Sequence, residues 1–383
     1  MNRTPRGNRL HIGIYGRRNA GKSTLINELT GQDIALVSDA PGTTTDPVYK
    51  SMELFGVGPV VFIDTAGFDD EGELGRLRVN KTEETLAKVD IAILVLENEN
   101  MYPDEREWHR KLADKGVPVI VYRKEAKGAQ AQAKNLEELR KAITEAVPED
   151  FVRDRVLGGL IEDGGLALLV IPQDIQAPAG RLILPQVQTL RELLDKRCTA
   201  VATTVERLER TLTLLNREPD LIITDSQCFR QVYDVKPPSS ALTSFSILFA
   251  AEKGDIDKFV SGASALDDLT VKIQSGEYLK AHILIAEACT HVPKGEDIGT
   301  VKIPAALKNF FDGKVEVSNV RGNDFPDTEE LQHFDLVIHC GACMFNRRHV
   351  LSRIAQCEEA GVPITNYGVV LAKLAGILDK IEI

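Results

Sequence analysis

The clearest chemistry in this chain lies in residues 16–23, whose sequence GRRNAGKS fits the pattern G-x-x-x-x-G-K-S of phosphate-binding loops. Its glycines allow a tight turn in which successive N–H groups point at phosphate oxygens. Lys22 is predicted to neutralise the β- and γ-phosphates, and the Ser23 hydroxyl is predicted to bind Mg²⁺. The apolar run 10–15 predicts a buried strand before the loop, and residues 22–29 predict a helix whose N-terminus faces the anion. The predicted nucleotide contacts of this loop are Gly16, Asn19, Ala20, Gly21, Lys22, Ser23 and Thr24.

Two further motifs follow the loop in an order typical of nucleotide switches. Residues 35–46, ALVSDAPGTTTD, form a threonine-rich segment in which Thr44 is predicted to bind Mg²⁺ when a γ-phosphate is present. An apolar run then leads into the tetrapeptide DTAG. Its Asp64 is predicted to hold Mg²⁺ through water, and its Gly67 to donate an N–H to the γ-phosphate. Together the three motifs predict a hydrolytic site with the catalytic residues Lys22, Thr44, Asp64 and Gly67.

These motifs resemble the translation-factor-related GTPases, in particular the branch that contains Era, Der and the tRNA-modification GTPase MnmE. The resemblance implies that the nucleotide is GTP. Members of that branch with Asn in the phosphate loop use it to bind K⁺, which substitutes for an arginine finger. Asn19 matches that position, with Ser38 and Thr43 in the accompanying loop. The resemblance therefore implies K⁺-stimulated hydrolysis, and the alternative is that Asn19 is a simple turn residue.

The segment that should recognise guanine departs from these relatives. The apolar runs 90–96 and 117–122 are the next predicted strands, and the resembling GTPases follow the second with N-K-x-D, whose Asp accepts two hydrogen bonds from guanine. The corresponding residues 123–126 are RKEA, which keep only the lysine. Residues 127–134 are too short for the usual helix and strand that carry the other base contact. Lys124 is a predicted nucleotide contact, and the choice between GTP and ATP stays open.

A second concentration of reactive side chains lies in the last quarter of the chain. A C-x-x-C pair, Cys340 and Cys343, follows the predicted strand 334–338, and Gly341 is expected to make the tight turn between them possible. A third thiol and two adjacent imidazoles are supplied by Cys289, His291 and His339. Three thiolates and one weaker ligand suit either Cys₃His zinc or a [4Fe–4S] cluster with one open iron, and the residues alone leave these two alternatives equal. Of the other candidates, Cys198, Cys228 and Cys357 are predicted core thiols, and His282, His333 and His349 predicted surface residues.

Composition limits the possible partners. The 383 residues suffice for two or three domains. Acidic residues number 57 against 46 basic ones, and the net charge of −11 disfavours a nucleic-acid partner, which would require a basic face. No apolar run of about 18 residues predicts a membrane span, and the polar N-terminus does not resemble a secretory signal. Six cysteines in such a chain favour metal binding or core thiols over disulfides, and a cytoplasmic location is expected.

The combined motifs resemble a known family over essentially the whole chain. C-x-H, a long spacer and H-C-x-x-C, downstream of an Era-like GTPase and a small middle domain, resemble the [FeFe]-hydrogenase maturation GTPase (HydF) family. This resemblance implies that Cys289, Cys340 and Cys343 ligate a [4Fe–4S] cluster, with His291 and His339 as candidates near an exchangeable fourth position. It also implies a scaffold or carrier that takes up a di-iron subcluster precursor made with two radical-SAM maturases. The carrier would then deliver that precursor to apo-[FeFe]-hydrogenase, with GTP hydrolysis as a switch.

The expected architecture is α/β throughout. Residues 1–150 are predicted to form a P-loop GTPase domain with a mostly parallel sheet flanked by helices. Residues 158–252 are predicted to be a small α/β domain, which by the resemblance forms a homodimer, and residues 253–383 an α/β cluster-binding domain. In the middle domain the pattern predicts strands over 166–171 and 221–224 and helices over 187–198 and 201–215. The alternative function is an Era- or MnmE-like GTPase of tRNA or ribosome assembly with a structural zinc site.

Overall fold

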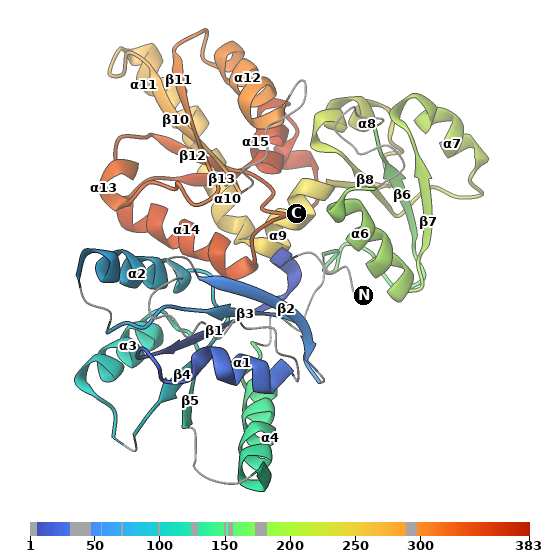
Figure 1. Ribbon diagram of the computed structural model, residues 1–383. Coiled ribbons are helices and arrows are strands. Elements are labelled where there is room, and N and C mark those ends of the chain that lie inside the picture. The colour runs from blue at the N-terminus through green and yellow to red at the C-terminus, as the bar shows by residue number, and fades with distance from the viewer. Residues whose placement is uncertain are drawn as a thin grey trace. The chain divides into compact units, whose positions relative to one another are not determined.

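The computed structural model describes residues 6–30, 47–54, 56–69, 72–98, 100–123, 129–148, 151, 156–172, 182–288 and 297–383. The chain divides into two compact units, Met1–Asp154 and Arg155–Ile383, whose elements are labelled in Figure 1. Among the described residues, no helix combines the length and the apolar character that crossing a membrane would require.

The first unit is built on a five-stranded sheet in the order β2-β3-β1-β4-β5. Its strands are β1 (Leu10–Gly16), β2 (Val48–Leu54), β3 (Gly58–Asp64), β4 (Ile91–Leu96) and β5 (Val119–Arg123). Strand β2 pairs antiparallel with β3, and the other neighbours pair parallel. The central strands β1 and β4 are buried along their whole length, which explains their continuous apolar sequences. The predicted, mostly parallel α/β sheet is confirmed.

Helices cover both faces of this sheet. They are α1 (Lys22–Thr30), α2 (Gly72–Thr85), α3 (Pro103–Asp114) and α4 (Ala129–Ala146). Side chains of β1 alternate between the two faces. Ile12 packs in one core cluster with Leu25 of α1 and Ile143 of α4, whereas Tyr15 packs in another cluster with Trp108 of α3. This layering fixes the loop between β1 and α1 at the carboxyl edge of the sheet.

The second unit contains two four-stranded sheets whose neighbouring strands all pair parallel. The first sheet has the order β7-β6-β8-β9, from β6 (Leu166–Val170), β7 (Thr199–Thr203), β8 (Leu221–Thr224) and β9 (Ala241–Ser244). The second has the order β11-β10-β12-β13, from β10 (Ala281–Glu287), β11 (Val315–Arg321), β12 (Leu336–His339) and β13 (Ile364–Asn366). The helices around them are α6 (Leu184–Asp195), α7 (Leu208–Leu214), α8 (Phe229–Val235), α9 (Phe245–Lys253), α10 (Ile256–Ala263), α11 (Ala265–Ser275), α12 (Ile303–Phe310), α13 (Thr328–Leu331), α14 (Arg347–Ala360) and α15 (Tyr367–Leu374).

A shared hydrophobic core joins these two sheets. One cluster of buried side chains includes Leu168 and Ile222 of the first sheet together with Leu284 and Val337 of the second. Ile247 of α9, the helix that follows the last strand of the first sheet, belongs to the same cluster. The continuous core explains why residues 155–383 form one compact unit.

The predicted elements of the middle segment are partly correct. The strands over 166–171 and 221–224 are confirmed as β6 and β8, and the helix over 187–198 corresponds to α6. The helix predicted over 201–215 is wrong in its first part, because residues 199–203, TAVAT, belong to β7. Thr and Val favour strands through their branched side chains, and the helical pattern begins only at Leu208.

Candidate functional site

The phosphate loop has the backbone conformation that its motif requires. Positive φ angles occur at Gly16 (152°), Asn19 (64°) and Gly21 (91°). A Cβ added at Gly16 would lie 2.6 Å from the carbonyl oxygen of Val95, so only glycine fits there. Asn is one of the few other residues that adopt the left-handed region readily. The backbone alone therefore gives Asn19 a turn role, whatever its side chain binds.

The predicted phosphate and magnesium residues lie together at this loop. Lys22 is buried, and its Nζ donates hydrogen bonds to the carbonyl oxygens of Gly16 (2.9 Å) and Arg17 (2.7 Å). Ser23 Oγ donates to Asp64 Oδ2 at 2.6 Å. Asp64 is the last residue of β3, which runs parallel to β1, so both residues reach the same edge of the sheet. The structure thus brings together two of the side chains predicted to hold Mg²⁺.

Gly67 packs directly against the phosphate loop. A Cβ added there would lie 2.6 Å from the backbone nitrogen of Arg18 and 2.9 Å from its Cα. The preceding Thr65 is buried, and its hydroxyl donates to the carbonyl of Ile14 at 2.6 Å, which fixes the start of the DTAG segment on β1. Any side chain at position 67 would push this segment away from the loop, so the motif needs glycine for a steric reason.

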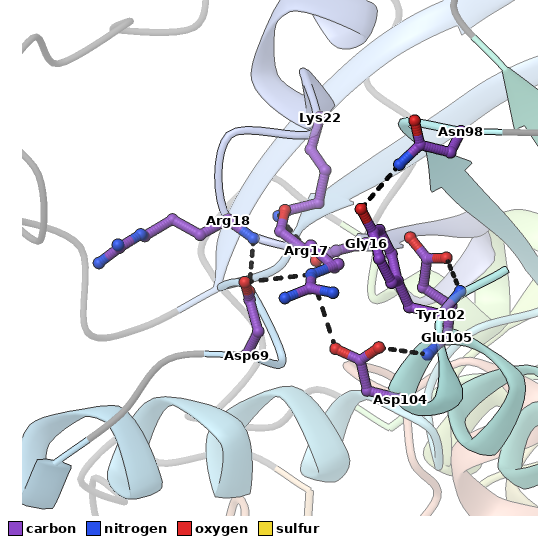
Figure 2. A network of polar contacts seen from close by, with 9 residues as sticks. All are labelled: Gly16, Arg17, Arg18, Lys22, Asp69, Asn98, Tyr102, Asp104 and Glu105. Atoms are coloured by element: carbon purple, nitrogen blue, oxygen red, sulfur yellow. Dashed lines mark hydrogen bonds and ion pairs between the residues drawn. The ribbon is translucent and has the colours of Figure 1, made fainter.

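Arg17 is the centre of a polar network, shown in Figure 2, that the sequence motifs do not predict. Arg17 Nε lies 3.3 Å from a carboxylate oxygen of Asp69 and 3.6 Å from one of Asp104. Its guanidinium stacks over the ring of Tyr102, 4.3 Å from the centroid. The other carboxylate oxygen of Asp69 accepts the backbone N–H of Arg18 at 2.6 Å. The two consecutive arginines inside the loop are the sequence signal for these acidic partners.

The structure describes only some of the remaining residues that are predicted to contact the nucleotide. Ala20 is buried and Thr24 lies in the first turn of α1. Ser38, Thr43, Thr44 and Lys124 lie outside the described residues, and their roles stay predictions. In the described part of the first unit the sheet ends at β5 and α4 is the next element, with no later strand to carry a second base contact.

In the second unit, the C-x-x-C pair lies where two neighbouring parallel strands end. Ala286 of β10 is paired with His339 of β12. Cys340 follows β12 directly. Cys289 comes three residues after Ala286 in the chain, but it lies, like His291, outside the described residues. Because parallel strands end at a common edge, Ala286 and Cys340 lie close together at this end of the sheet, where the Cys340 N–H donates to the Ala286 carbonyl at 3.0 Å.

Backbone N–H groups point at the Cys340 sulfur. Sγ accepts hydrogen bonds from the backbone nitrogens of Ala288 (3.0 Å) and Ala342 (3.4 Å). Hydrogen bonds to a ligating sulfur are one of the means by which proteins tune iron–sulfur clusters. Ala288 immediately precedes Cys289 in the chain, so this contact brings the β10 end of the chain onto the C-x-x-C turn.

The turn itself differs from the prediction. The left-handed residue is Ala342, with φ of 50°, and the prediction that Gly341 makes the turn possible is wrong. A Cβ added at Gly341 would meet no described atom within 4 Å. Burial raises the pKa of the Cys343 thiol, while the nearby charge of Lys253 and backbone N–H groups of the turn oppose that rise.

His339 already has partners for both ring nitrogens. Nδ1 lies 2.8 Å from the carbonyl oxygen of Cys340, and Nε2 lies 3.0 Å from Nη1 of Arg353. A carbonyl only accepts and a guanidinium only donates, so Nδ1 carries the proton and Nε2 accepts. Burial and the charge of Arg353 lower the pKa of His339 to about 3, which keeps the ring neutral. To bind a metal through Nε2, His339 would have to lose its hydrogen bond from Arg353. The observed geometry therefore does not favour the prediction that His339 is a metal ligand.

The other candidate side chains are mostly where the sequence placed them. Cys198, Cys228 and Cys357 are buried as predicted. The prediction that His349 is a surface residue is wrong, because it is buried and stacks on Phe345 with ring centroids 3.8 Å apart. Among the residues that the structure describes, no group of three or more His, Cys, Asp or Glu side chains is arranged to hold a metal ion. A complete set would need residues from the segment that contains Cys289 and His291.

Comparison with known families decides the identity of the chain. Residues 156–254 match the hydrogen maturase F dimerization domain, and residues 257–382 match the hydrogen maturase F tetramerization domain. The chain belongs to the HydF family. Residues 11–124 match the family described as 50S ribosome-binding GTPase, so the N-terminal domain of this HydF protein is a GTPase domain. The part predicted to bind the cluster is thus the part named for tetramerization.

Individual relatives match the GTPase domain. GTPase Der of Wolinella succinogenes is 41% identical over 118 residues, which cover 29% of this chain and 25% of Der. The tRNA modification GTPase MnmE of Myxococcus xanthus is 33% identical over 171 residues, which cover 44% of this chain and 38% of MnmE. A crystal structure of Era in complex with MgGDPNP and 16S ribosomal RNA nucleotides matches with 17% identity and a TM-score of 0.32, over 51% of this chain and 91% of Era. The chain spans well under half the length of the Der and MnmE relatives.

Together these findings indicate a GTPase of hydrogenase maturation. GTP and Mg²⁺ are the ligands that its N-terminal domain implies. The HydF dimerization and tetramerization domains indicate that the chain associates with copies of itself.

Proposed function

We propose that this HydF protein is a scaffold and carrier in [FeFe]-hydrogenase maturation. It binds a [4Fe–4S] cluster through Cys289, Cys340 and Cys343, receives a di-iron precursor made with two radical-SAM maturases, and delivers it to apo-hydrogenase. The observation that carries this proposal is the Cys340 sulfur, which accepts two backbone N–H groups at the common edge of β10 and β12. One of these donors belongs to the residue that precedes Cys289.

Two of the three proposed thiolate ligands, Cys340 and Cys343, lie on the described C-x-x-C turn, and Cys289 lies outside the described residues. The N–H groups of Ala288 and Ala342 donate to the Cys340 sulfur, and hydrogen bonds of this kind are common at cluster thiolates. His339 is occupied by Arg353 and by the Cys340 carbonyl, which leaves His291 or an external group for the fourth position. When bound, the cluster would supply an iron with an exchangeable coordination position, to which a cargo that carries its own ligands could attach.

The GTPase domain acts in this proposal as a switch for partner exchange. Lys22 neutralises the phosphates, Ser23 and Thr44 bind Mg²⁺, and Gly67 donates its N–H to the γ-phosphate. Loss of the γ-phosphate then releases the segment that Gly67 and Asp69 hold against the loop. Identical partner affinities and identical cluster spectra in GTP and GDP would contradict this switch.

Delivery is tested by activation of apo-hydrogenase. Protein loaded by the two radical-SAM maturases should activate the apo-enzyme, and Cys343→Ser should reduce the hydrogen evolution obtained by more than about tenfold. Changes to groups that only orient metal ligands already cost 10–100-fold, so removal of a ligand should cost at least as much. The matched control is Cys198→Ala, which removes a buried thiol near β7. Equal activation by wild type and Cys343→Ser would refute the delivery role.

The K⁺ role of Asn19 is tested by Asn19→Gly. Glycine keeps the left-handed backbone at φ of 64° and removes only the amide that would bind K⁺. Phosphate release by wild type should be about tenfold or more faster in K⁺ than in Na⁺ at equal ionic strength, since one lost charge-stabilising contact can cost that much or more. The variant should have the slow rate in both salts. A wild-type rate that is the same in K⁺ and Na⁺ would leave Asn19 with its turn role alone.

A further inference from the structure

A buried arginine lies behind the C-x-x-C turn without a carboxylate partner in the described part of the chain. Arg353 of α14 is 3% exposed. Its Nη1 donates to His339 Nε2 at 3.0 Å, and its Nη2 donates to the carbonyl of Gly322. Its Nε has no hydrogen-bond partner among the described residues. A buried cation with only neutral partners is costly unless a counter-charge lies near.

Aromatic rings fix the plane of this guanidinium. Arg353 Cζ lies 4.5 Å from the ring centroid of Phe325 and 4.6 Å from that of Phe345. Such ring faces attract a cation and hold it without neutralising it. The helix register also fixes the position of Arg353. It lies on the same buried face of α14 as Val350 and Ile354. Its position is therefore built into the packing around the turn.

Two thiol sulfurs lie close enough to Arg353 to affect its charge. Burial lowers the pKa of Arg353 to about 10, and the Cys340 and Cys357 sulfurs oppose that shift. At the other thiol of the pair, burial raises the pKa of Cys343, and the nearby charge of Lys253 opposes that rise. Lys253 is buried at the end of α9, where its Nζ donates to the carbonyl of Phe345 at 3.2 Å. Each cysteine of the C-x-x-C pair thus has a buried cation of its own nearby.

We propose that Arg353 is a positioning residue whose buried charge balances the thiolate at Cys340 and raises the reduction potential of the cluster bound there. The inference rests on the proposed cluster function and assigns a role to a residue outside the ligand set. Reduction adds one negative charge to the site, and a fixed positive charge in a poorly solvated environment stabilises the reduced form more than the oxidised form. Without Arg353 the cluster should be harder to reduce.

The test compares Arg353→Gln, which removes the charge, with Arg353→Lys, which keeps it. Each protein is reconstituted anaerobically with iron and sulfide, and the midpoint potential is measured by EPR during a redox titration. At the wild-type midpoint, Arg353→Gln should show about a tenfold lower ratio of reduced to oxidised cluster, which is about 59 mV for a one-electron couple. Arg353→Lys should stay close to wild type.

The possible outcomes separate charge from packing. Failure of Arg353→Gln to hold the cluster, with Arg353→Lys holding it, would also show that the charge is required. An unchanged midpoint in Arg353→Gln, or equal losses in both variants, would overturn the inference. Wild-type protein that takes up zinc and no cluster would instead refute the underlying cluster function, and this result is visible before any variant is made.

Discussion

Replacing Cys340 by serine is expected to abolish the [4Fe–4S] signal of the reconstituted protein. Cys340 is a proposed ligand whose sulfur accepts the backbone N–H groups of Ala288 and Ala342. A serine hydroxyl is a much poorer ligand for iron and titrates far above the thiol. The measurement is anaerobic reconstitution with iron and sulfide, followed by EPR of the reduced protein and determination of bound iron.

A matched cysteine distinguishes loss of a ligand from loss of a buried thiol. Cys228→Ala removes a thiol that is 8% exposed and lies in the hydrophobic core of the second unit. It should keep full iron content and the wild-type signal. A cluster signal that survives in Cys340→Ser would exclude Cys340 as a ligand. Colourless wild-type protein with stoichiometric zinc would favour the alternative of an Era- or MnmE-like GTPase with a structural metal.

The phosphate site was predictable because each of its requirements is local. A left-handed or crowded backbone position needs glycine, and a phosphate needs a cation. The residue types at positions 16–23 are therefore sufficient to predict the conformation of the loop and its ligand. The structure confirms the strand, loop and helix and places Ser23 beside Asp64. It adds the steric reason for Gly67, whose missing side chain makes room for the backbone of Arg18. That reason could not be predicted, because it depends on two segments 49 positions apart in the sequence meeting in space.

The thiolate site was predictable only in its ligands. Cysteine spacing pointed to residues 340 and 343, but the groups that hold them come from elsewhere. Arg353 occupies a helix position whose sequence, RRHVLSRIAQCEEA, carries charge on several sides, and nothing in that pattern shows that this arginine turns inward. The sequence also favours Gly341 over Ala342 for the left-handed position of the turn, because glycine adopts a positive φ most easily. Buried charge and backbone strain are properties of tertiary packing, which one sequence does not display.

Several strands were missed for a related reason. Strand β11, VEVSNVR, is at the edge of its sheet and is only partly buried, so its sequence is more polar than that of a central strand. Strand β13 has only three residues, but pairing with β12 and contact with α10 bury it completely. Short parallel strands are specified by long-range neighbours more than by their own residues.

Replacing Lys22 by alanine is expected to reduce GTP hydrolysis by about 10²–10³-fold. The ammonium is held over the loop by the carbonyls of Gly16 and Arg17, so it is oriented before the nucleotide arrives. Loss of one preorganised group that stabilises developing charge costs a factor of this size. The measurement is phosphate release at saturating GTP, with Lys81→Ala as the control. Lys81 is an exposed lysine of α2 whose ion pair with Glu84 lies at the surface, and its loss should leave the rate unchanged.

The same variant also tests whether the two sites depend on each other. Residues 1–154 and 155–383 form separate compact units with their own cores. Lys22→Ala should therefore keep its iron content and cluster signal while it loses hydrolysis. If GTP hydrolysis regulates partner exchange, this variant should also lose the difference in partner affinity between GTP and GDP. A wild-type rate in Lys22→Ala would remove the phosphate loop from the mechanism, whereas loss of the cluster would show that the first unit is needed for assembly of the second site.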